Sequence, residues 1–172
     1  AGKLAGKIRE LSSGACYNPD KTGYIEFDRS KLNALVAEIA KRNTRVAVCY
    51  WYQHELERIR QVLPHAVLYE GKVQEDLWNA GKIEVLLIHP QASGHGINLQ
   101  FGGHVMIWFS IIRSQELWSQ TCMRLPRRGQ KNTVKLIHLI AEGSSDEAAL
   151  QALLTNQENE QAVIDAVMQW VG

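Results

Sequence analysis

Three arginines gather in one short stretch of a chain that is otherwise almost neutral. Arg124, Arg127 and Arg128 lie within five positions of "QTCMRLPRRGQ", between Gln120 and Gln130, whereas the net charge of all 172 residues is +1. Guanidinium groups make planar, multidentate contacts with phosphate. An arginine placed beside a transferring γ-phosphoryl group can raise the rate by about 10³ to 10⁵. The alternative is that these cations sit at a helix C-terminus and only complement its dipole.

A proline separates the arginines. Pro126 disfavours helical geometry at Leu125, so a helix over residues 114–124 is expected to end there. Gln120 and Arg124, four residues apart, would share one face of that helix. Arg127 would point elsewhere.

A glycine-rich stretch, "QASGHGINLQ", offers a second place for an anion. Gly94 and Gly96 allow positive φ and a close backbone approach, and exposed amides in such a loop bind anions. Ser93 and Asn98 add short polar groups. A plain strand-to-helix turn explains the same residues equally well. A dinucleotide-binding fingerprint is excluded because its third glycine position holds Leu99, and a nucleophile elbow is excluded because position 91 is glutamine.

Short apolar runs alternate with amphipathic segments and must position these loops. Strands are expected at 45–52, 66–70, 84–90, 104–110 and 133–142, and helices at 28–43, 53–63, 73–82, 114–124, 144–156 and 158–171. Strands that are apolar on both faces belong to a parallel sheet covered by helices. The pattern predicts an α/β domain whose ligands lie beyond the carboxyl ends of the strands. The loops at 50–55, 90–100 and 109–115 all follow strand ends.

Composition limits the classes of protein to which the chain can belong. With 45% hydrophobic and 22% charged residues, the chain is expected to be a soluble globular domain. Its three cysteines are an odd number without a close pair, which favours a reducing compartment. No apolar run reaches the ~18 residues of a membrane span, and the N-terminus lacks the apolar centre of a secretory signal. We therefore expect a cytoplasmic protein with no membrane partner. No metal site is predicted, because His89 and His95 lack ligand spacing with any cysteine.

The order of these segments resembles the superfamily-two helicases of the Swi/Snf type. Gln-x3-Arg-x2-Arg-x-Gly-Gln, which begins at Gln120, resembles motif VI, and the run from Ala92 to Leu99 is similar to motif V. The strand and loop at 45–59 are similar to motif IV, and "LIAEGSSDE" resembles the turn that starts a late helix. The resemblance covers about residues 30 to 155, and this form of motif V is similar to that of compact phage and prophage members.

The resemblance implies a RecA-like three-layer α/β/α lobe with a central, mostly parallel sheet. Residues 1–29 would form a lead-in segment, residues 30–155 the helicase C-terminal lobe, and residues 156–172 a C-terminal helix packed on that lobe. The family's motor has two such lobes, and ATP with Mg²⁺ is held mainly by the first. This chain has no Gly-Lys-[Ser/Thr] loop, and "DEAA" at 146–149 is expected to be a helix start. We therefore expect this lobe to be inactive alone.

The same resemblance assigns residues to an ATP-facing group. Arg124 and Arg127 would face the ATP phosphates, with Arg127 as the arginine finger, and Gln120 would help to orient the site. The remaining ATP-binding residues implied are Gly94, Gly96 and Gln130.

A DNA-facing group is implied in the same way. The DNA backbone, expected to be double-stranded, would be contacted by Gln53, His54, Ser93, Asn98 and Arg128. A solvated helix start explains Gln53 and His54 equally well.

Two main function classes stay open. The first is the second motor lobe of an ATP-dependent DNA helicase or translocase, whose partners are the N-terminal RecA-like lobe of the same protein and DNA. The alternative is a non-catalytic α/β module that binds nucleic acid or protein and keeps a relict motif VI. A weaker third reading is a small-molecule nucleotide-binding domain that uses the glycine-rich loop.

Overall fold

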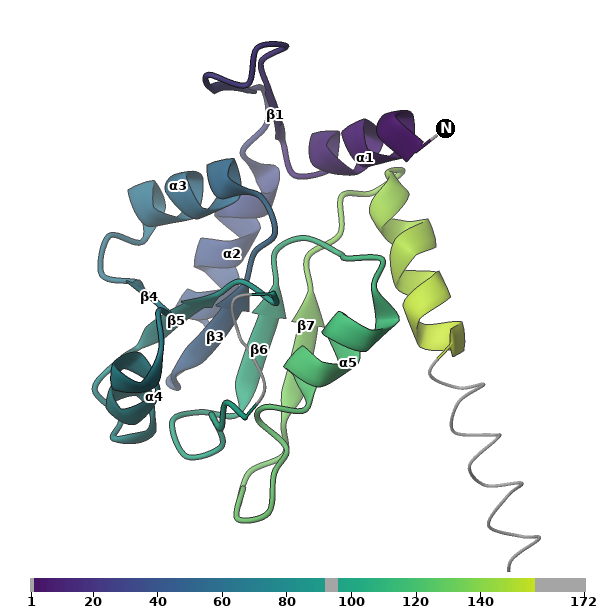
Figure 1. Ribbon diagram of the computed structural model, residues 1–172. Helices are drawn as coiled ribbons and strands as arrows, with labels where there is room; N and C mark the ends of the chain where they lie inside the picture. Colours follow the sequence, from purple (N-terminus) through teal and green to yellow (C-terminus); the bar gives the residue numbers. More distant parts are fainter. Residues whose placement is uncertain (1, 92–95, 157–172) are drawn as a thin grey trace, which may run out of the picture.

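A five-stranded sheet forms the centre of the protein (Figure 1). The computed structural model describes residues 2–91 and 96–156. The strands are β3 (Val46–Cys49), β4 (Val67–Leu68), β5 (Val85–Ile88), β6 (Val105–Trp108) and β7 (Lys135–His138), in the order β4-β5-β3-β6-β7. All neighbouring pairs are parallel, and Val46 of β3 lies opposite both Val85 and Val105. Each strand lies inside a run expected to be a strand but is shorter, because the apolar residues at the ends of these runs pack in the connecting loops.

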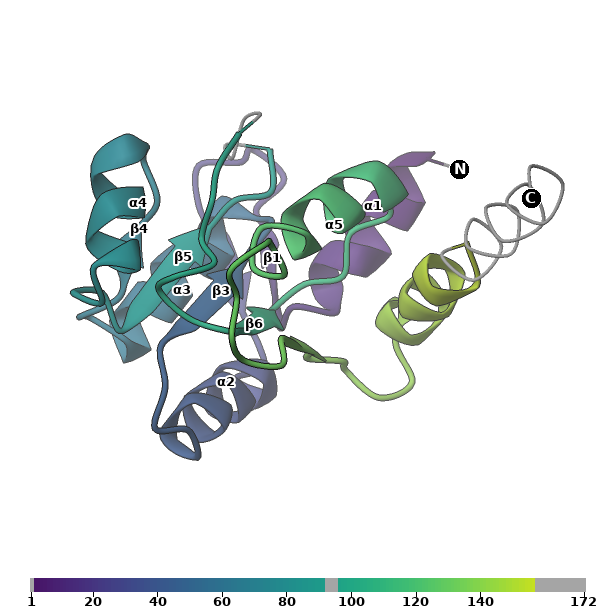
Figure 2. The ribbon, with the colours of Figure 1, turned by 90° about the horizontal axis from the view of Figure 1, so that it is seen from below.

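Helices cover both faces of this sheet (Figure 2). On one face lie α2 (Ser30–Ala40) and α3 (Gln53–Val62); on the other lie α4 (Lys72–Asn79), α5 (Gln115–Cys122) and a helix over 145–156. The residues of β3 divide alternately between two apolar clusters: Ala47 and Cys49 face α4 and α5, whereas Val46 and Val48 face α2 and α3. The predicted three-layer α/β/α arrangement is confirmed.

Burial of these strands supplies the core. Every residue of β3, β5 and β6 is buried, as parallel strands covered on both faces require. Each large aliphatic side chain taken out of water contributes about 1.5–3 kcal/mol. At the edge of the sheet, β7 departs from this pattern, since Lys135 and Leu136 are exposed.

A tight glycine pair fixes the segment that enters β6. A Cβ atom at Gly102 would lie 2.2 Å from the indole ring of Trp78 on α4. The indole nitrogen of Trp78 also donates to the carbonyl of Leu99 at 2.8 Å. Only glycine fits beneath this ring, so the chain from Leu99 to Gly103 is held against α4.

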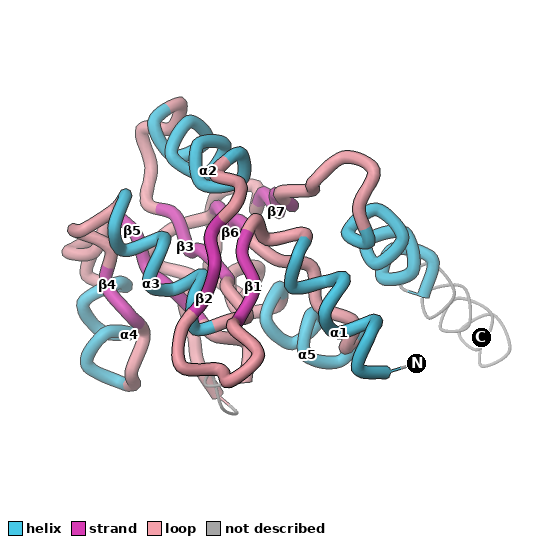
Figure 3. The backbone as a smooth tube through the Cα atoms, turned by 90° about the horizontal axis from the view of Figure 1, so that it is seen from above, coloured by secondary structure: helices cyan, strands magenta, loops and turns pink. Residues whose placement is uncertain are grey.

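The first 29 residues contain a helix and a hairpin. The helix is α1 (Gly2–Leu11), and the hairpin consists of the antiparallel strands β1 (Ala15–Tyr17) and β2 (Tyr24–Glu26). The two strands lie between α1 and the start of α3 (Figure 3). The sequence indicated only the turn "YNPDKTG" here, because three-residue strands are too short to show a periodicity. Gly14, with φ of 85°, makes the sharp turn between α1 and β1.

One buried ion pair joins elements that are distant in the sequence. Lys31 of α2 pairs with Asp146, and its ammonium also donates to the carbonyl of Phe109 at 3.1 Å. Asp146 lies in the first turn of the 145–156 helix, so the "DEAA" segment is a helix start, as predicted. The expected helix at 158–171 lies outside the described residues. Within the described ranges, no helix has the length and apolar character needed to cross a bilayer.

Candidate functional site

The loops after β3, β5 and β6 meet at the carboxyl edge of the sheet, where Glu55 links two of them. One carboxylate oxygen accepts hydrogen bonds from the backbone amides of Trp51 at 2.8 Å and Tyr52 at 3.1 Å. The other oxygen accepts from the hydroxyl of Ser110, which follows β6. Burial raises the pKa of Glu55, and the hydrogen bonds from Ser110, Trp51 and Tyr52 oppose this rise. Glu55 thus ties the ends of β3 and β6 together.

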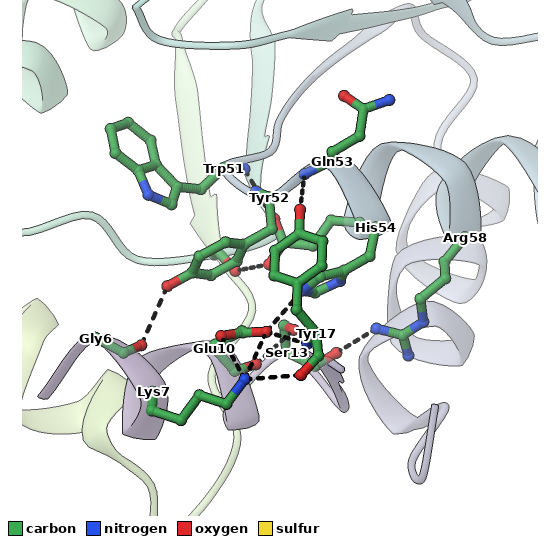
Figure 4. Close-up of polar contacts among 12 residues, drawn as sticks. Gly6, Lys7, Glu10, Ser13, Tyr17, Trp51, Tyr52, Gln53, His54 and Arg58 are labelled. Carbon is green, nitrogen blue, oxygen red and sulfur yellow. Dashed lines mark hydrogen bonds and ion pairs between the residues drawn. The ribbon is translucent and has the colours of Figure 1, made fainter. Parts of the chain in front are cut away.

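The start of α3 is covered by the hairpin (Figure 4). The hydroxyl of Tyr17 accepts from the backbone amide of Gln53 at 3.0 Å, and the side chain of Gln53 points away from this contact. His54 is 1% exposed and is enclosed by the rings of Tyr17, Tyr24 and Tyr52. Burial lowers the pKa of His54 to about 4. Contrary to the expectation from the sequence, His54 cannot reach a DNA phosphate in this structure, because α1 and the hairpin lie over it.

An arginine on α3 is fully committed to internal contacts. Arg58 is 0% exposed, and its Nε pairs with Glu26 at 2.6 Å. Its two terminal nitrogens donate to the carbonyls of Ser13 and Asp28, both at 2.7 Å. The planar guanidinium therefore joins α3 to β2 and to the segments directly before β1 and after β2, and it is not available to a ligand.

The glycine-rich loop is described only from Gly96 onward. Ser93 and Gly94 lie outside the described residues. Gly96 is exposed and has a φ of 103°, a positive value of the kind that glycine allows. Asn98 uses its side-chain oxygen to accept from the backbone amide of Gln100 at 3.2 Å, and its carbonyl accepts from Asn79 of α4 at 2.7 Å. Asn98 therefore fixes the exit of the loop.

The two expected phosphate ligands differ in exposure. Helix α5 ends at Cys122, earlier than predicted, so Arg124 lies beyond it in a turn. Arg124 is 4% exposed, and burial together with the nearby charge of Arg127 lowers its pKa. Arg127 is exposed, and its Nε donates to the carbonyl of Met123 at 3.3 Å. The two arginines differ in exposure, but α5 ends before Leu125, where Pro126 was expected to end it.

Gln120 is not drawn into this pair. Its side chain is exposed on α5 and donates to Glu116, one turn earlier, at 2.9 Å. Because α5 ends before Arg124, Gln120 and Arg124 do not share a helix face as expected.

Two glutamines bind the end of the glycine-rich segment to the arginine segment. The amide of Gln130 donates to the carbonyls of Gln100 at 2.8 Å and Gly103 at 3.0 Å, and the amide of Gln100 donates to the carbonyl of Arg128 at 2.9 Å. Gly129 has a φ of 107°, and a Cβ there would lie 3.1 Å from Gln100. In this structure Gln130, expected at the ATP, joins two loops.

The segment that carries the arginines is rich in exposed cations, and we call it the basic surface. We define it as residues 113–135, which hold six cations and the single acid Glu116. Across the described part of the chain, no ion pair involves Arg113, Arg127, Arg128, Lys131 or Lys135, and all five are exposed. By contrast, the cations in and directly after α2 and at the start of α4 form several ion pairs with nearby acids. Cations without acidic neighbours remain available to an anionic partner.

Sequence reasoning missed three residues that organise the site. Glu55 had a usable signal, since glutamate at the third position of a helix often reaches back to the amides before it. His89 and Gln100 had none, because their partners lie 38 and 28 residues away, at Trp51 and Arg128.

A parallel sheet of this order with helices on both faces defines a RecA-like α/β lobe. The chain matches no protein-family model. Its fold is similar to that in the crystal structure of the C-terminal part of the Fun30 ATPase domain, with a TM-score of 0.61 and 22% identity, covering 72% of this chain and 44% of that one. In sequence it is 30% identical over 168 residues to protein p41 of Acyrthosiphon pisum secondary endosymbiont phage 1. That match covers 94% of this chain but 36% of p41, so the chain spans about a third of that relative.

Proposed function

We propose that the chain is the second motor lobe of a Swi/Snf-like, ATP-dependent DNA helicase or translocase, and that it acts on ATP bound by a first lobe. The observation that carries the proposal is the pair Arg124 and Arg127 on a RecA-like lobe. One guanidinium is held inside the fold, and the other is exposed beside it. The similarity to part of an ATPase domain supports the same reading.

The donor chemistry at this place suits phosphate. Arg127 makes one hydrogen bond within the described residues, from Nε to Met123, so its terminal nitrogens remain available for phosphate oxygens. Guanidinium groups do not ligate Mg²⁺, which prefers oxygen ligands. We therefore assign Mg²⁺ and most contacts to ATP to the first lobe, while this lobe supplies positive charge to the γ-phosphate.

In this mechanism the two arginines have separate tasks. Arg127 is the finger that neutralises charge developing on the transferred phosphoryl group. Arg124 is close enough to Tyr69 and Glu75 for their charges to act on its pKa, and it adds a second positive charge behind the finger. The links between Gln100 and Gln130 hold the glycine-rich segment and the arginine segment at a fixed spacing.

The basic surface at residues 113–135 is the proposed place of contact with the DNA backbone. Arg128 directly follows the finger in the sequence, and Gln53, Ser93 and Asn98 are the further contacts we propose. Such contacts read phosphate and not base sequence, so we expect binding to double-stranded DNA to be independent of sequence and strongly weakened by salt.

The finger is tested by changing Arg127 to alanine in the longer protein that carries both lobes. We expect DNA-stimulated ATP hydrolysis to fall by about 10³-fold or more, with kcat affected and ATP binding nearly unchanged. The matched control is Arg60→Ala, which removes an exposed arginine of α3 outside the basic surface and should retain most of the hydrolysis rate. An Arg127→Ala protein that hydrolyses ATP at the wild-type rate would exclude the finger role. If the wild-type protein bound DNA without hydrolysing ATP, the non-catalytic module would be the correct reading.

A further inference from the structure

His89 occupies a junction between two of the loops at the carboxyl edge of the sheet. It directly follows β5, and its half-buried ring stacks on the indole of Trp51, with 5.1 Å between centroids and 20° between planes. The ring of Tyr50 meets it edge-on at 5.4 Å. Both aromatic partners follow β3, the strand beside β5. The imidazole is therefore packed between the chain leaving β5 and the chain leaving β3.

The hydrogen bonds of this ring define its protonation. The backbone amide of Gln91 can only donate, and it lies 3.2 Å from Nδ1, so Nδ1 carries no proton. The carbonyl of Trp51 can only accept, and it lies 3.1 Å from Nε2, so Nε2 carries the proton. Both contacts require the neutral imidazole with its proton on Nε2. A protonated ring would lose the bond to Gln91.

The same junction reaches a third strand through Glu55. Trp51 accepts from His89 through its carbonyl and donates to Glu55 through its amide. Glu55 in turn accepts from Ser110, which follows β6. Two side chains, His89 and Glu55, thus connect the carboxyl ends of the adjacent strands β5, β3 and β6.

We propose that His89 is a positioning residue that fixes the start of the glycine-rich loop, at Gln91, against the loop after β3. The inference rests on the proposed function, which assigns these two loops to contacts with the DNA backbone. The inference adds that the hydrogen bonds of His89 keep the two loops at a constant distance from each other. Burial lowers the pKa of His89, which favours the neutral ring that both hydrogen bonds need.

The geometry is tested directly on this chain by ¹⁵N NMR of histidine side chains at pH 7. We expect His89 to show a pyridine-like Nδ1 and a pyrrole-like Nε2, with slow exchange of the Nε2 proton. Observation of the opposite tautomer, or of an imidazolium, would overturn the proposal whatever the activity of the longer protein.

The functional consequence is tested with three variants in the longer protein. His89→Phe keeps the ring stack but neither hydrogen bond, His89→Asn places an acceptor near the position of Nδ1, and His89→Gln places a donor near that of Nε2. We expect DNA-stimulated kcat to fall by about 10- to 100-fold in the phenylalanine variant and to recover in part in the asparagine variant. The control His65→Phe, at an exposed histidine, should keep the wild-type rate.

These outcomes separate the inference from the proposed function. A wild-type protein without DNA-stimulated hydrolysis contradicts the proposed function, and the NMR result still decides the geometry. An active wild type with His89→Phe at the same rate contradicts the inference and leaves the proposed function intact. If His89→Phe does not fold, the difference between the asparagine and glutamine variants decides, because equal rates in those two would overturn the role of the Gln91 bond.

Discussion

Helix α3 and the segment after α5 each carry an arginine, but the two regions differ in what those arginines contact. On α3, Arg58 has an acceptor at each of its three nitrogens, and His54, at the start of the helix, is closed in by aromatic rings. After α5, Arg127 is exposed and uses one nitrogen on a backbone carbonyl. In the first region each donor nitrogen of the arginine has an internal acceptor, whereas in the second region the arginine has unused donors.

The difference shows how similar residue types serve structure or binding according to desolvation. Removing a guanidinium from water costs several kcal/mol, so a buried arginine persists where internal acceptors replace the water, as at Arg58. An exposed guanidinium keeps its hydration until an anion arrives, as at Arg127. Exposure and unused donors, more than the presence of arginine, therefore mark a candidate phosphate ligand.

The largest effect expected from this comparison concerns stability. Arg58→Ala leaves one carboxylate oxygen of Glu26 and the two carbonyls of Ser13 and Asp28 without the guanidinium, so we expect the free energy of unfolding to fall by about 3–5 kcal/mol. Arg127→Ala removes an exposed side chain and should change it by less than about 0.5 kcal/mol. Urea denaturation of the two variants measures the difference. Equal destabilisation would break the distinction between the regions.

An intermediate effect is expected from pH at the start of α3. The folded-state pKa of His54, about 4, lies below the ordinary value of 6.5, so the unfolded chain binds more protons between these values. The stabilising contribution is complete above pH 6.5 and is lost as pH falls toward 4, by roughly 3 kcal/mol at about 1.4 kcal/mol per pKa unit. Denaturation curves at several pH values should show a weaker pH dependence in His54→Phe than in the wild type. His65→Phe, the exposed control, should retain the wild-type slope.

The smallest effect is expected on the basic surface. Arg128→Ala should leave the unfolding free energy within about 0.5 kcal/mol of the wild type. In the longer protein it should lower the slope of log affinity for DNA against log salt by about 1, since one phosphate contact is lost. Fluorescence anisotropy over a salt series measures this slope. An unchanged slope would remove Arg128 from the proposed DNA contacts.

The sequence predicted the α/β layers well, because long apolar runs such as 45–52 and 84–90 bury both faces of parallel strands. It predicted an end of α5 beside Pro126, whereas the helix ends before Leu125. It could not predict that His54 is covered, because the covering residues belong to the first 29 positions and meet α3 only after folding. For the same reason the sequence assigned Gln130 to ATP and did not predict its hydrogen bonds to Gln100 and Gly103. These bonds join residues that are about 30 positions apart.

The close fit of Trp78 over Gly102 has a mechanical consequence for the glycine-rich segment. With the indole 2.2 Å from where a Cβ would be, the chain between Leu99 and Gly103 has no slack in which to slide along the sheet. Gln130 of the arginine segment is hydrogen-bonded to Gln100 and Gly103. A displacement of the arginine segment would therefore also displace α4, because the chain between them cannot shift at the entry to β6. An added residue between Leu99 and Gly103 would displace this contact, so the length of that connection is set by one tryptophan.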